Sequence, residues 1–283
     1  MTIETVAQDN EVLLSPATGI SKFNPIGMFD SGLGGLTVMQ QIVNKLPNED
    51  IIYFGDTARV PYGGKSRETI IRYSIENAIF LIERNIKVLV VACNTATSHG
   101  LEKLQHIFNI PIIGVIDPGA ERAVKASSNK RIAVLGTKGT IQSQAYQNAI
   151  LKRAPDAVIF PIACPLFVPL VEEGCLDHPA AHLIVREYLK TLKEENIDTI
   201  LLGCTHYPLM TKLIRAEVGD DIVIVDSAIS CAEKIASLLN ELDLTNENDN
   251  IPSYRYFVSD DAHKFQTLGS SFLGLPIKHV ELR

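Results

Sequence analysis

Two cysteines follow apolar strands in closely matching contexts. Cys93 lies in Val88–His99, which reads V-L-V-V-A-C-N-T-A-T-S-H, and Cys204 lies in Thr199–Leu209, which reads T-I-L-L-G-C-T-H-Y-P-L. In both segments polar residues open a predicted helix directly after the cysteine. A helix N-terminus lowers the pKa of a thiol from about 8.5 toward that of a usable thiolate. The remaining cysteines lack such a context and are interpreted as structural: Cys164, Cys175 and Cys231.

Two thiols that face one cleft permit a disulfide, a metal site, or acid–base catalysis on opposite faces of one carbon. A disulfide has little reason to persist in a reducing compartment. A zinc site would lack the short ligand spacing of structural zinc sites; its ligands would be Cys93, Cys204, His206 and Glu173. Acid–base catalysis fits best, because inverting a stereocentre requires one group to remove a proton and another to return one to the other face. The two sulfurs would then lie about 7 Å apart with the substrate between them.

Each candidate thiol has an expected ionisable partner. Asp30 ends the first apolar strand at a glycine-rich turn and would serve Cys93. His206 lies two residues after Cys204 and would serve that thiol. A carboxylate from residues 172–173, if that pair is not simply solvated, would orient the imidazole.

Two glycine-rich segments resemble nucleotide-binding motifs but do not match them. The loop 30–36 would need glycine at position 37 to be a dinucleotide fingerprint, and that position is Thr37. A P-loop ending at residues 64–66 would need glycine at position 59, which is Arg59. What remains at 30–36 is a turn whose free N–H groups suit a carboxylate or phosphate.

The chain alternates apolar strands with amphipathic helices, which predicts an α/β fold with parallel sheets covered on both faces. The predicted strands are 26–29, 51–54, 87–92, 111–116, 131–135, 158–162, 199–202, 222–225, 254–258 and 277–282. The predicted helices are 37–46, 66–84, 95–108, 141–153, 180–195, 209–218, 228–242 and 261–272. The interval from Asp30 to Cys93 is similar to that from Thr137 to Cys204, which indicates two related halves, each with one cysteine at a strand's carboxyl end. Ligands of open α/β sheets bind at that end.

Composition narrows the class of protein. The 283 residues are 46% hydrophobic and 21% charged, with a net charge of -7, which is ordinary for a soluble globular protein and argues against a nucleic-acid or membrane partner. Scattered cysteines and the lack of a signal peptide or membrane span favour a cytoplasmic location. Residues 1–24 show no periodicity and are expected to form a poorly ordered extension.

Five segments closely resemble the glutamate racemases of the aspartate/glutamate racemase superfamily. They are F-D-S-G-L-G-G-L-T-V at Phe29–Val38, G-D-T-A-R-V-P-Y-G at Gly55–Gly63, A-C-N-T-A-T at Ala92–Thr97, G-V-I-D-P-G at Gly114–Gly119 and G-C-T-H-Y-P-L at Gly203–Leu209. The likeness runs in order from about residue 25 to residue 225.

This resemblance implies cofactor-independent interconversion of L- and D-glutamate, without a metal, that supplies D-glutamate for bacterial peptidoglycan. It implies that Cys93 and Cys204 are the two bases, that Asp30 and His206 assist them, and that Glu173 supports His206. It also implies a set of substrate contacts: Asp30, Ser31, Tyr62, Gly63, Asn94, Thr95, Thr205 and His206.

The family's architecture implies two pseudo-symmetric three-layer α/β domains with the active site in the cleft between them. The first would comprise residues 25–115 and 229–283, and the second residues 116–228. A homodimer is expected. Since some members with an extension such as 1–24 respond to a peptidoglycan precursor, such an effector is a hypothesis for this chain.

Three alternatives remain open at this point. The chain could act on a related amino acid such as aspartate. It could be a cysteine hydrolase that uses Cys204 with His206 and Glu173, in which case Cys93 would be dispensable. It could also clamp glutamate without chemistry. A pyridoxal phosphate enzyme is disfavoured, because no lysine lies in a recognisable site motif.

Overall fold

The computed structural model describes residues 15–16, 19–248 and 251–283. Most of the predicted extension 1–24 lies outside these residues. Residues 19–24 of the extension contact the body of the protein, because the buried Lys87 Nζ donates a hydrogen bond to the carbonyl of Lys22 at 2.7 Å.

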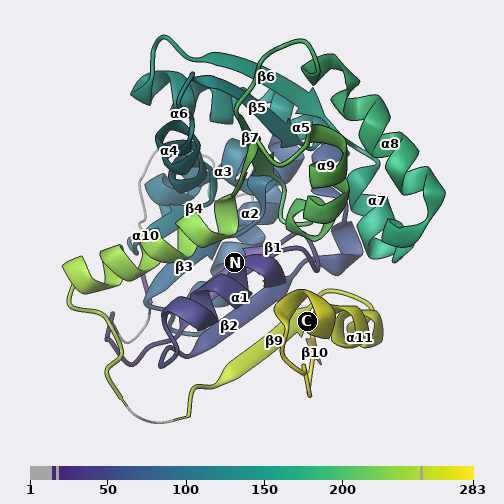
Figure 1. Cartoon of the computed structure of the whole chain (residues 1–283). Coiled ribbons are helices and arrows are strands. Elements are labelled where there is room, and N and C mark those ends of the chain that lie inside the picture. Colours follow the sequence, from purple (N-terminus) through teal and green to yellow (C-terminus); the bar gives the residue numbers. More distant parts are fainter. Residues whose placement is uncertain (1–14, 17–18, 249–250) are drawn as a thin grey trace.

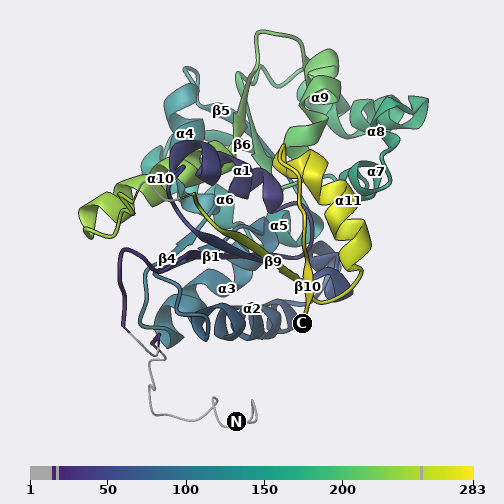
Figure 2. The same cartoon turned by 90° about the horizontal axis from the view of Figure 1, so that it is seen from below.

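The first lobe is built on a six-stranded parallel sheet in the order β10-β9-β2-β1-β3-β4. Its strands are β1 (Ile26–Asp30), β2 (Ile51–Gly55), β3 (Val88–Val91), β4 (Ile112–Gly114), β9 (Tyr254–Val258) and β10 (Glu281–Leu282). Its helices are α1 (Leu36–Lys45), α2 (Arg67–Ile82), α3 (Asn94–Ile107), α10 (Ser227–Glu241) and α11 (Ala262–Leu273). Figure 2 shows α2 and α3 on one face of this sheet and α1, α10 and α11 on the other. The first lobe is therefore a three-layer structure.

The second lobe has a four-stranded parallel sheet in the order β6-β5-β7-β8. Its strands are β5 (Arg131–Gly136), β6 (Val158–Ala163), β7 (Thr199–Gly203) and β8 (Val223–Asp226). Its helices are α4 (Ile116–Ala126), α5 (Lys138–Gln142), α6 (Ala145–Arg153), α7 (Phe167–Glu172), α8 (Pro179–Leu189) and α9 (Thr211–Val218). Apolar side chains of α4 and α6 cover one face, and those of α7, α8 and α9 lie in the cluster on the other.

The predicted internal repeat is visible in the strand order. The order β2-β1-β3-β4 of the first lobe corresponds to β6-β5-β7-β8 of the second. Cys93 follows β3 and Cys204 follows β7, and each of these strands pairs with the first strand of its lobe, β1 or β5. Both thiols therefore occupy the same place in their half of the molecule.

The two lobes share apolar packing. One core cluster runs from the α1 side of the first sheet to the α7–α9 side of the second. α10 packs against α1 of the first lobe and α4 of the second, and it lies between them in Figure 1. After the second lobe the chain returns through α10 to β9. The first sheet is therefore formed by two separate parts of the sequence.

Several predicted elements differ from the structure. The sequence pattern misses α4, because Pro118 and Gly119 suggest a turn, yet proline is tolerated in the first turn of a helix, where its missing N–H has no partner to lose. The helix predicted at 141–153 is divided into α5 and α6 at Gln144, whose φ is 58°. The helix predicted at 180–195 ends at Leu189 and continues as a 3-10 turn. Across the part of the chain that the structure describes, no helix is long and apolar enough to cross a membrane.

Candidate active site

A narrow cavity lies where the carboxyl ends of the two sheets face each other, and its walls come from both lobes. Its volume is about 20 Å³. The lining residues are Ser31, Val60, Pro61, Tyr62, Gly63, Cys93, Asn94, Thr95, Thr137, Val168, Cys204, Thr205 and His206. Both candidate thiols thus border one shared cavity, as the repeat predicts.

Cys93 is the N-cap residue of α3 and is 6% exposed. Burial raises the pKa of its thiol to about 12, and the nearby negative charge of Asp30 acts in the same direction. Hydrogen bonds from the Ala96 amide and the Ser31 side chain oppose this shift without cancelling it. The helix N-terminus therefore does not make Cys93 a ready thiolate here, because desolvation outweighs it.

Asp30 is the last residue of β1 and is fully buried. One carboxylate oxygen accepts a hydrogen bond from the Gly32 amide at 2.9 Å, and the other accepts one from the Thr205 hydroxyl at 3.4 Å. Burial raises the pKa of Asp30, while the positive charge of His206 lowers it. Asp30 is therefore an acid beneath the cavity wall that links the glycine-rich turn to the second lobe.

Cys204, His206 and Glu172 form a chain of polar contacts. Cys204 Sγ lies 3.8 Å from His206 Nδ1, and His206 Nε2 lies 3.0 Å from Glu172 Oε1. Burial lowers the pKa of His206, but Cys204 and Glu172 outweigh it and raise that pKa to about 10. His206 is therefore an imidazolium near neutral pH, held between a sulfur and a carboxylate.

The carboxylate that contacts His206 is Glu172, so the expected role of Glu173 is wrong. Glu173 points away and forms an ion pair with Lys264 of α11 at 3.7 Å, with 70% of its side chain exposed. Burial opposes ionisation of Glu172, yet His206 and Lys264 bring its pKa below the usual range. Glu172 ends α7, whereas Glu173 already lies outside that helix, and only the first of the two directs its side chain at the imidazole.

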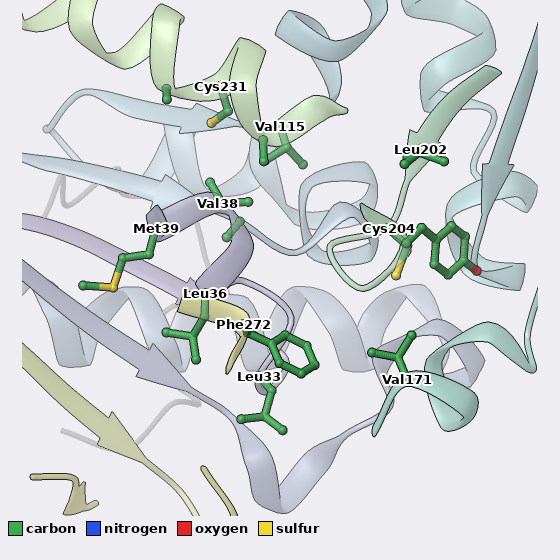
Figure 3. Close-up of a cluster of buried hydrophobic side chains, with 14 of the residues drawn as sticks. Leu33, Leu36, Val38, Met39, Val115, Val171, Leu202, Cys204, Cys231 and Phe272 are labelled. Carbon is green, nitrogen blue, oxygen red and sulfur yellow. The ribbon is translucent and has the colours of Figure 1, made fainter. Parts of the chain in front are cut away.

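Apolar side chains pack in the core around Cys204 and His206. Val171 and Phe272 belong to the same buried cluster as Cys204, and Figure 3 shows all three around the carboxyl end of β7. The ring of Phe272 meets the His206 ring edge-on, with 5.9 Å between the centroids. Phe272 therefore covers the side of the imidazole that faces α11, and His206 is buried.

Contacts between the lobes surround the cavity. Thr37 Oγ1 donates to the carbonyl of Thr205 at 2.9 Å, and the hydroxyls of Thr95 and Thr137 lie 2.9 Å apart. A Cβ at Gly34 would lie 2.2 Å from Thr205 Oγ1, so only glycine permits the turn to come this close to the second lobe. The glycine-rich turn is thus explained by lobe contact rather than by a nucleotide.

A family model described as Asp/Glu/Hydantoin racemase matches residues 26–235. The chain belongs to this family. It is 51% identical over 249 residues to the glutamate racemase of Geobacter metallireducens, which covers 88% of this chain and 92% of the relative. An amino-acid racemase is an isomerase, and this is the class of enzyme to which the chain belongs.

Solved structures of the Asp/Glu/Hydantoin racemase family agree with the fold. A glutamate racemase isoform from Bacillus anthracis has a TM-score of 0.89 at 39% identity, with 93% of this chain and 98% of that chain covered. The glutamate racemase of Francisella tularensis, solved in complex with D-glutamate, has a TM-score of 0.87 at 38% identity with the same coverage. The α/β fold with two parallel sheets is therefore confirmed.

Most of the residues predicted to contact substrate border the cavity. They are Ser31, Tyr62, Gly63, Asn94, Thr95, Thr205 and His206. Asp30 does not line it and lies behind Thr205. Four lining residues were not predicted: Val60, Pro61, Thr137 and Val168. Thr137 had a usable signal, since it follows β5 at the place that Ser31 occupies after β1 in the first lobe, whereas Val168 of α7 carries none.

The cavity does not present a cluster suited to a metal ion. Within the described ranges, no three histidine, cysteine or acidic side chains come together in a way that could hold one. The zinc site considered from the sequence also loses Glu173, which lies against Lys264. The cavity instead has two thiols, one near Asp30 and the other beside His206. All four groups can carry a proton.

Proposed function

We propose that the chain racemises glutamate by two-base proton transfer, with Cys93 and Cys204 on opposite faces of the substrate Cα. The observation that carries this proposal is the shared cavity, to which each lobe contributes one sulfur. A hydrolase would need only one thiol, and a binding protein would need neither.

The step conserves protons and electrons without a co-reactant. A thiolate on one face takes the Cα proton, and the electron pair left on carbon is delocalised into the adjacent carboxylate. The thiol on the opposite face then donates its proton to Cα, which inverts the centre and leaves that sulfur as the thiolate. The reverse reaction begins from this second sulfur, so the two cysteines exchange roles according to the enantiomer.

The ionisable neighbours are proposed to serve the two sulfurs unequally. His206 is close enough to Cys204 to exchange a proton with it, and Glu172 stabilises the imidazolium. Cys93 instead lies within reach of the negative charge of Asp30. We propose that the ammonium group of the bound substrate promotes ionisation of Cys93, because a nearby positive charge favours the thiolate.

Substrate recognition is proposed to rest on neutral donors. Hydroxyls of Ser31, Thr95 and Thr205 and the amide of Asn94 border the cavity, and two of its walls begin helical segments. Backbone N–H groups at a helix start favour carboxylates. Glutamate is proposed over aspartate because relatives at 38–51% identity over most of the chain carry that name, one of them holding D-glutamate.

The cavity must enlarge to admit an amino acid. A volume of about 20 Å³ holds about one water molecule. Because the lobes meet there through hydroxyl and backbone hydrogen bonds, each of modest net strength, we propose that the lobes separate to admit substrate.

Proton exchange in deuterated water tests this function. The protein is incubated separately with L- and D-glutamate, and Cα deuterium and the opposite enantiomer are followed by mass spectrometry and chiral chromatography. We expect Cα deuterium and the opposite enantiomer to accumulate from either form of glutamate without added cofactor. From aspartate both products should form more slowly or not at all. Binding without exchange would contradict the proposal, as would full activity in Cys93→Ala.

The remaining expectations concern the setting of the reaction. We propose that the product supplies peptidoglycan synthesis in the cytoplasm, that the chain forms a homodimer, and that a peptidoglycan precursor regulates it. The proposed role in peptidoglycan synthesis is supported by the activity for which the relatives are named. Analytical ultracentrifugation tests the dimer, and kinetics with and without residues 1–24 test the regulation.

A further inference from the structure

Only one of the two polar atoms of the Asn94 side chain has a hydrogen-bond partner among the described residues. Asn94 opens α3, is 2% exposed and borders the cavity. Its Oδ1 accepts a hydrogen bond from the Tyr146 hydroxyl at 2.6 Å. Its Nδ2 is buried and has no hydrogen-bond partner among the described residues. A buried donor without a partner is costly, so a ligand that accepts from it recovers that cost on binding.

Tyr146 is held rigidly where it meets Asn94. It belongs to α6 of the second lobe, is fully buried, and lies in the core cluster under α4. A Cβ at Gly203 would lie 2.9 Å from the Tyr146 ring, so glycine at this position leaves room for the phenol.

The hydroxyl of Tyr146 keeps its proton. Burial raises the pKa of Tyr146, and the neighbouring charge of Asp226 acts in the same direction. The phenol therefore has its proton near neutral pH, and the hydroxyl donates it to Asn94 Oδ1. With Oδ1 committed to the phenol, Nδ2 is the polar atom of Asn94 left for the cavity.

We propose that Tyr146 is a positioning residue that turns the Asn94 amide so that Nδ2 donates to a carboxylate oxygen of the substrate. Because Tyr146 lies on the second lobe and Asn94 on the first, the oriented donor forms only when the lobes come together. Closure and substrate recognition are therefore coupled through one hydrogen bond. This inference rests on the proposed racemase function and adds a residue that does not border the cavity.

A double-mutant cycle on glutamate racemisation tests the coupling. Tyr146→Phe removes only the hydroxyl, and we expect KM to rise about 2- to 10-fold, as the loss of one hydrogen bond predicts, with a smaller change in kcat. In the Asn94→Ala background the same change is expected to alter KM by less than about 2-fold, since its target is gone. An equal effect of Tyr146→Phe in both backgrounds, or an unchanged KM in the single variant, would overturn the inference.

Asn94→Asp probes the donor independently of any change at Tyr146. The carboxylate still accepts from the Tyr146 hydroxyl, but it places an oxygen where Nδ2 lay, so KM should rise more than in Asn94→Ala. Binding like that of the original chain would show that Nδ2 is not used, and would overturn the inference even if Tyr146→Phe failed to fold.

Tyr207→Phe is the matched control. Tyr207 is also fully buried and donates one hydrogen bond, to the carbonyl of Cys164 at 2.8 Å, but it does not border the cavity. We expect a similar loss of unfolding free energy in both tyrosine variants and a raised KM only in Tyr146→Phe. Equal KM changes would indicate general loosening and defeat the proposal. If the unaltered chain does not racemise glutamate, it is the proposed function that fails; if it does and no coupling appears, only this inference fails.

Discussion

The two halves of the cavity share a backbone plan but differ in electrostatics. Cys93 and Cys204 follow equivalent strands of repeated sheets, and each is 6% exposed. Cys93 lies near the buried acid Asp30, and burial with that negative charge raises its pKa to about 12. Cys204 instead lies beside His206, whose own pKa is raised to about 10. One sulfur therefore faces an anion and the other a cation.

The difference shows that a repeat can place equivalent atoms without giving them equivalent chemistry. The sheet order determines where each thiol lies, while its charged neighbours, Asp30 for Cys93 and His206 for Cys204, are individual side chains that the two halves do not share. By strand register Gly136 of β5 stands where Asp30 of β1 stands, so the second lobe has no acid at this place. Glu172 comes from α7, a helix of the second lobe. An enzyme that works on both enantiomers thus need not have symmetric bases.

The largest effect is expected from removing either sulfur. Cys93→Ser and Cys204→Ser should each lower kcat/KM for racemisation by about 100- to 10,000-fold, the range for loss of a positioned acid or base. Residual Cα exchange in deuterated water should begin only from the enantiomer whose hydrogen faces the remaining thiol, so the two variants should show opposite preferences. Cys175→Ser is the control, since Cys175 does not line the cavity. The same preference in both variants would contradict a two-sided site.

A smaller loss is expected when the imidazolium loses its carboxylate. Glu172→Gln should lower kcat/KM by about 10-fold, part of the contribution of a general acid, and should lower the pKa of His206. Glu173→Gln is the matched control, because this neighbour contacts Lys264 instead. Steady-state kinetics of both variants show which carboxylate supports His206. A greater loss in Glu173→Gln would favour Glu173, as the sequence predicted.

The raised pKa of His206 also predicts how stability depends on pH. The folded pKa is about 10 against an ordinary value of 6.5, so the folded state holds this proton more tightly than the unfolded chain. The resulting stabilisation is complete below about pH 6.5 and is lost as pH rises through about 10. Urea unfolding at pH 6, 8 and 10 should show this decline, and Glu172→Gln should flatten it. Equal slopes in the two proteins would contradict the coupling.

Removing the charge of Asp30 should make the Cys93 thiol easier to ionise. Asp30 acts to raise the pKa of Cys93, so Asp30→Asn should shift the pH dependence of Cys93 alkylation to lower pH. Mass spectrometry of iodoacetamide-treated protein measures each cysteine separately, and Cys231, whose pKa is raised by burial and by Asp226, is the internal control. A shift at both cysteines would indicate a general opening of the fold.

The smallest effect is expected at the surface contact between α7 and α11. Lys264 and Glu173 are 42% and 70% exposed and lie 3.7 Å apart, so their ion pair contributes at most about 1 kcal/mol. Lys264→Gln should lower the free energy of unfolding by less than that, and should change kcat/KM less than Glu172→Gln does. Denaturation and kinetics at low and high salt measure the free energy of unfolding and kcat/KM of this variant. A 10-fold loss of activity would show that Lys264 takes part in catalysis.

The features that the sequence predicts well are local. Alternating strands and helices, the two cysteine motifs and His206 beside Cys204 all depend on residues close together in the chain, whose periodicity and spacing persist in the fold. The choice between Glu172 and Glu173 is not local. Successive residues near a helix end point roughly 100° apart, so the docking of α7 decides which carboxylate meets the imidazole.

The sequence by itself determined the α/β class, the duplicated strand–cysteine–helix units and the two sulfurs on which the proposed chemistry depends. Only the tertiary structure decided that both sulfurs border one cavity, that burial and Asp30 hold the Cys93 proton tightly, and that Tyr146 of one lobe orients Asn94 of the other. The physical reason is that desolvation and hydrogen-bond direction depend on what packs around a group, and those neighbours come from distant parts of the chain.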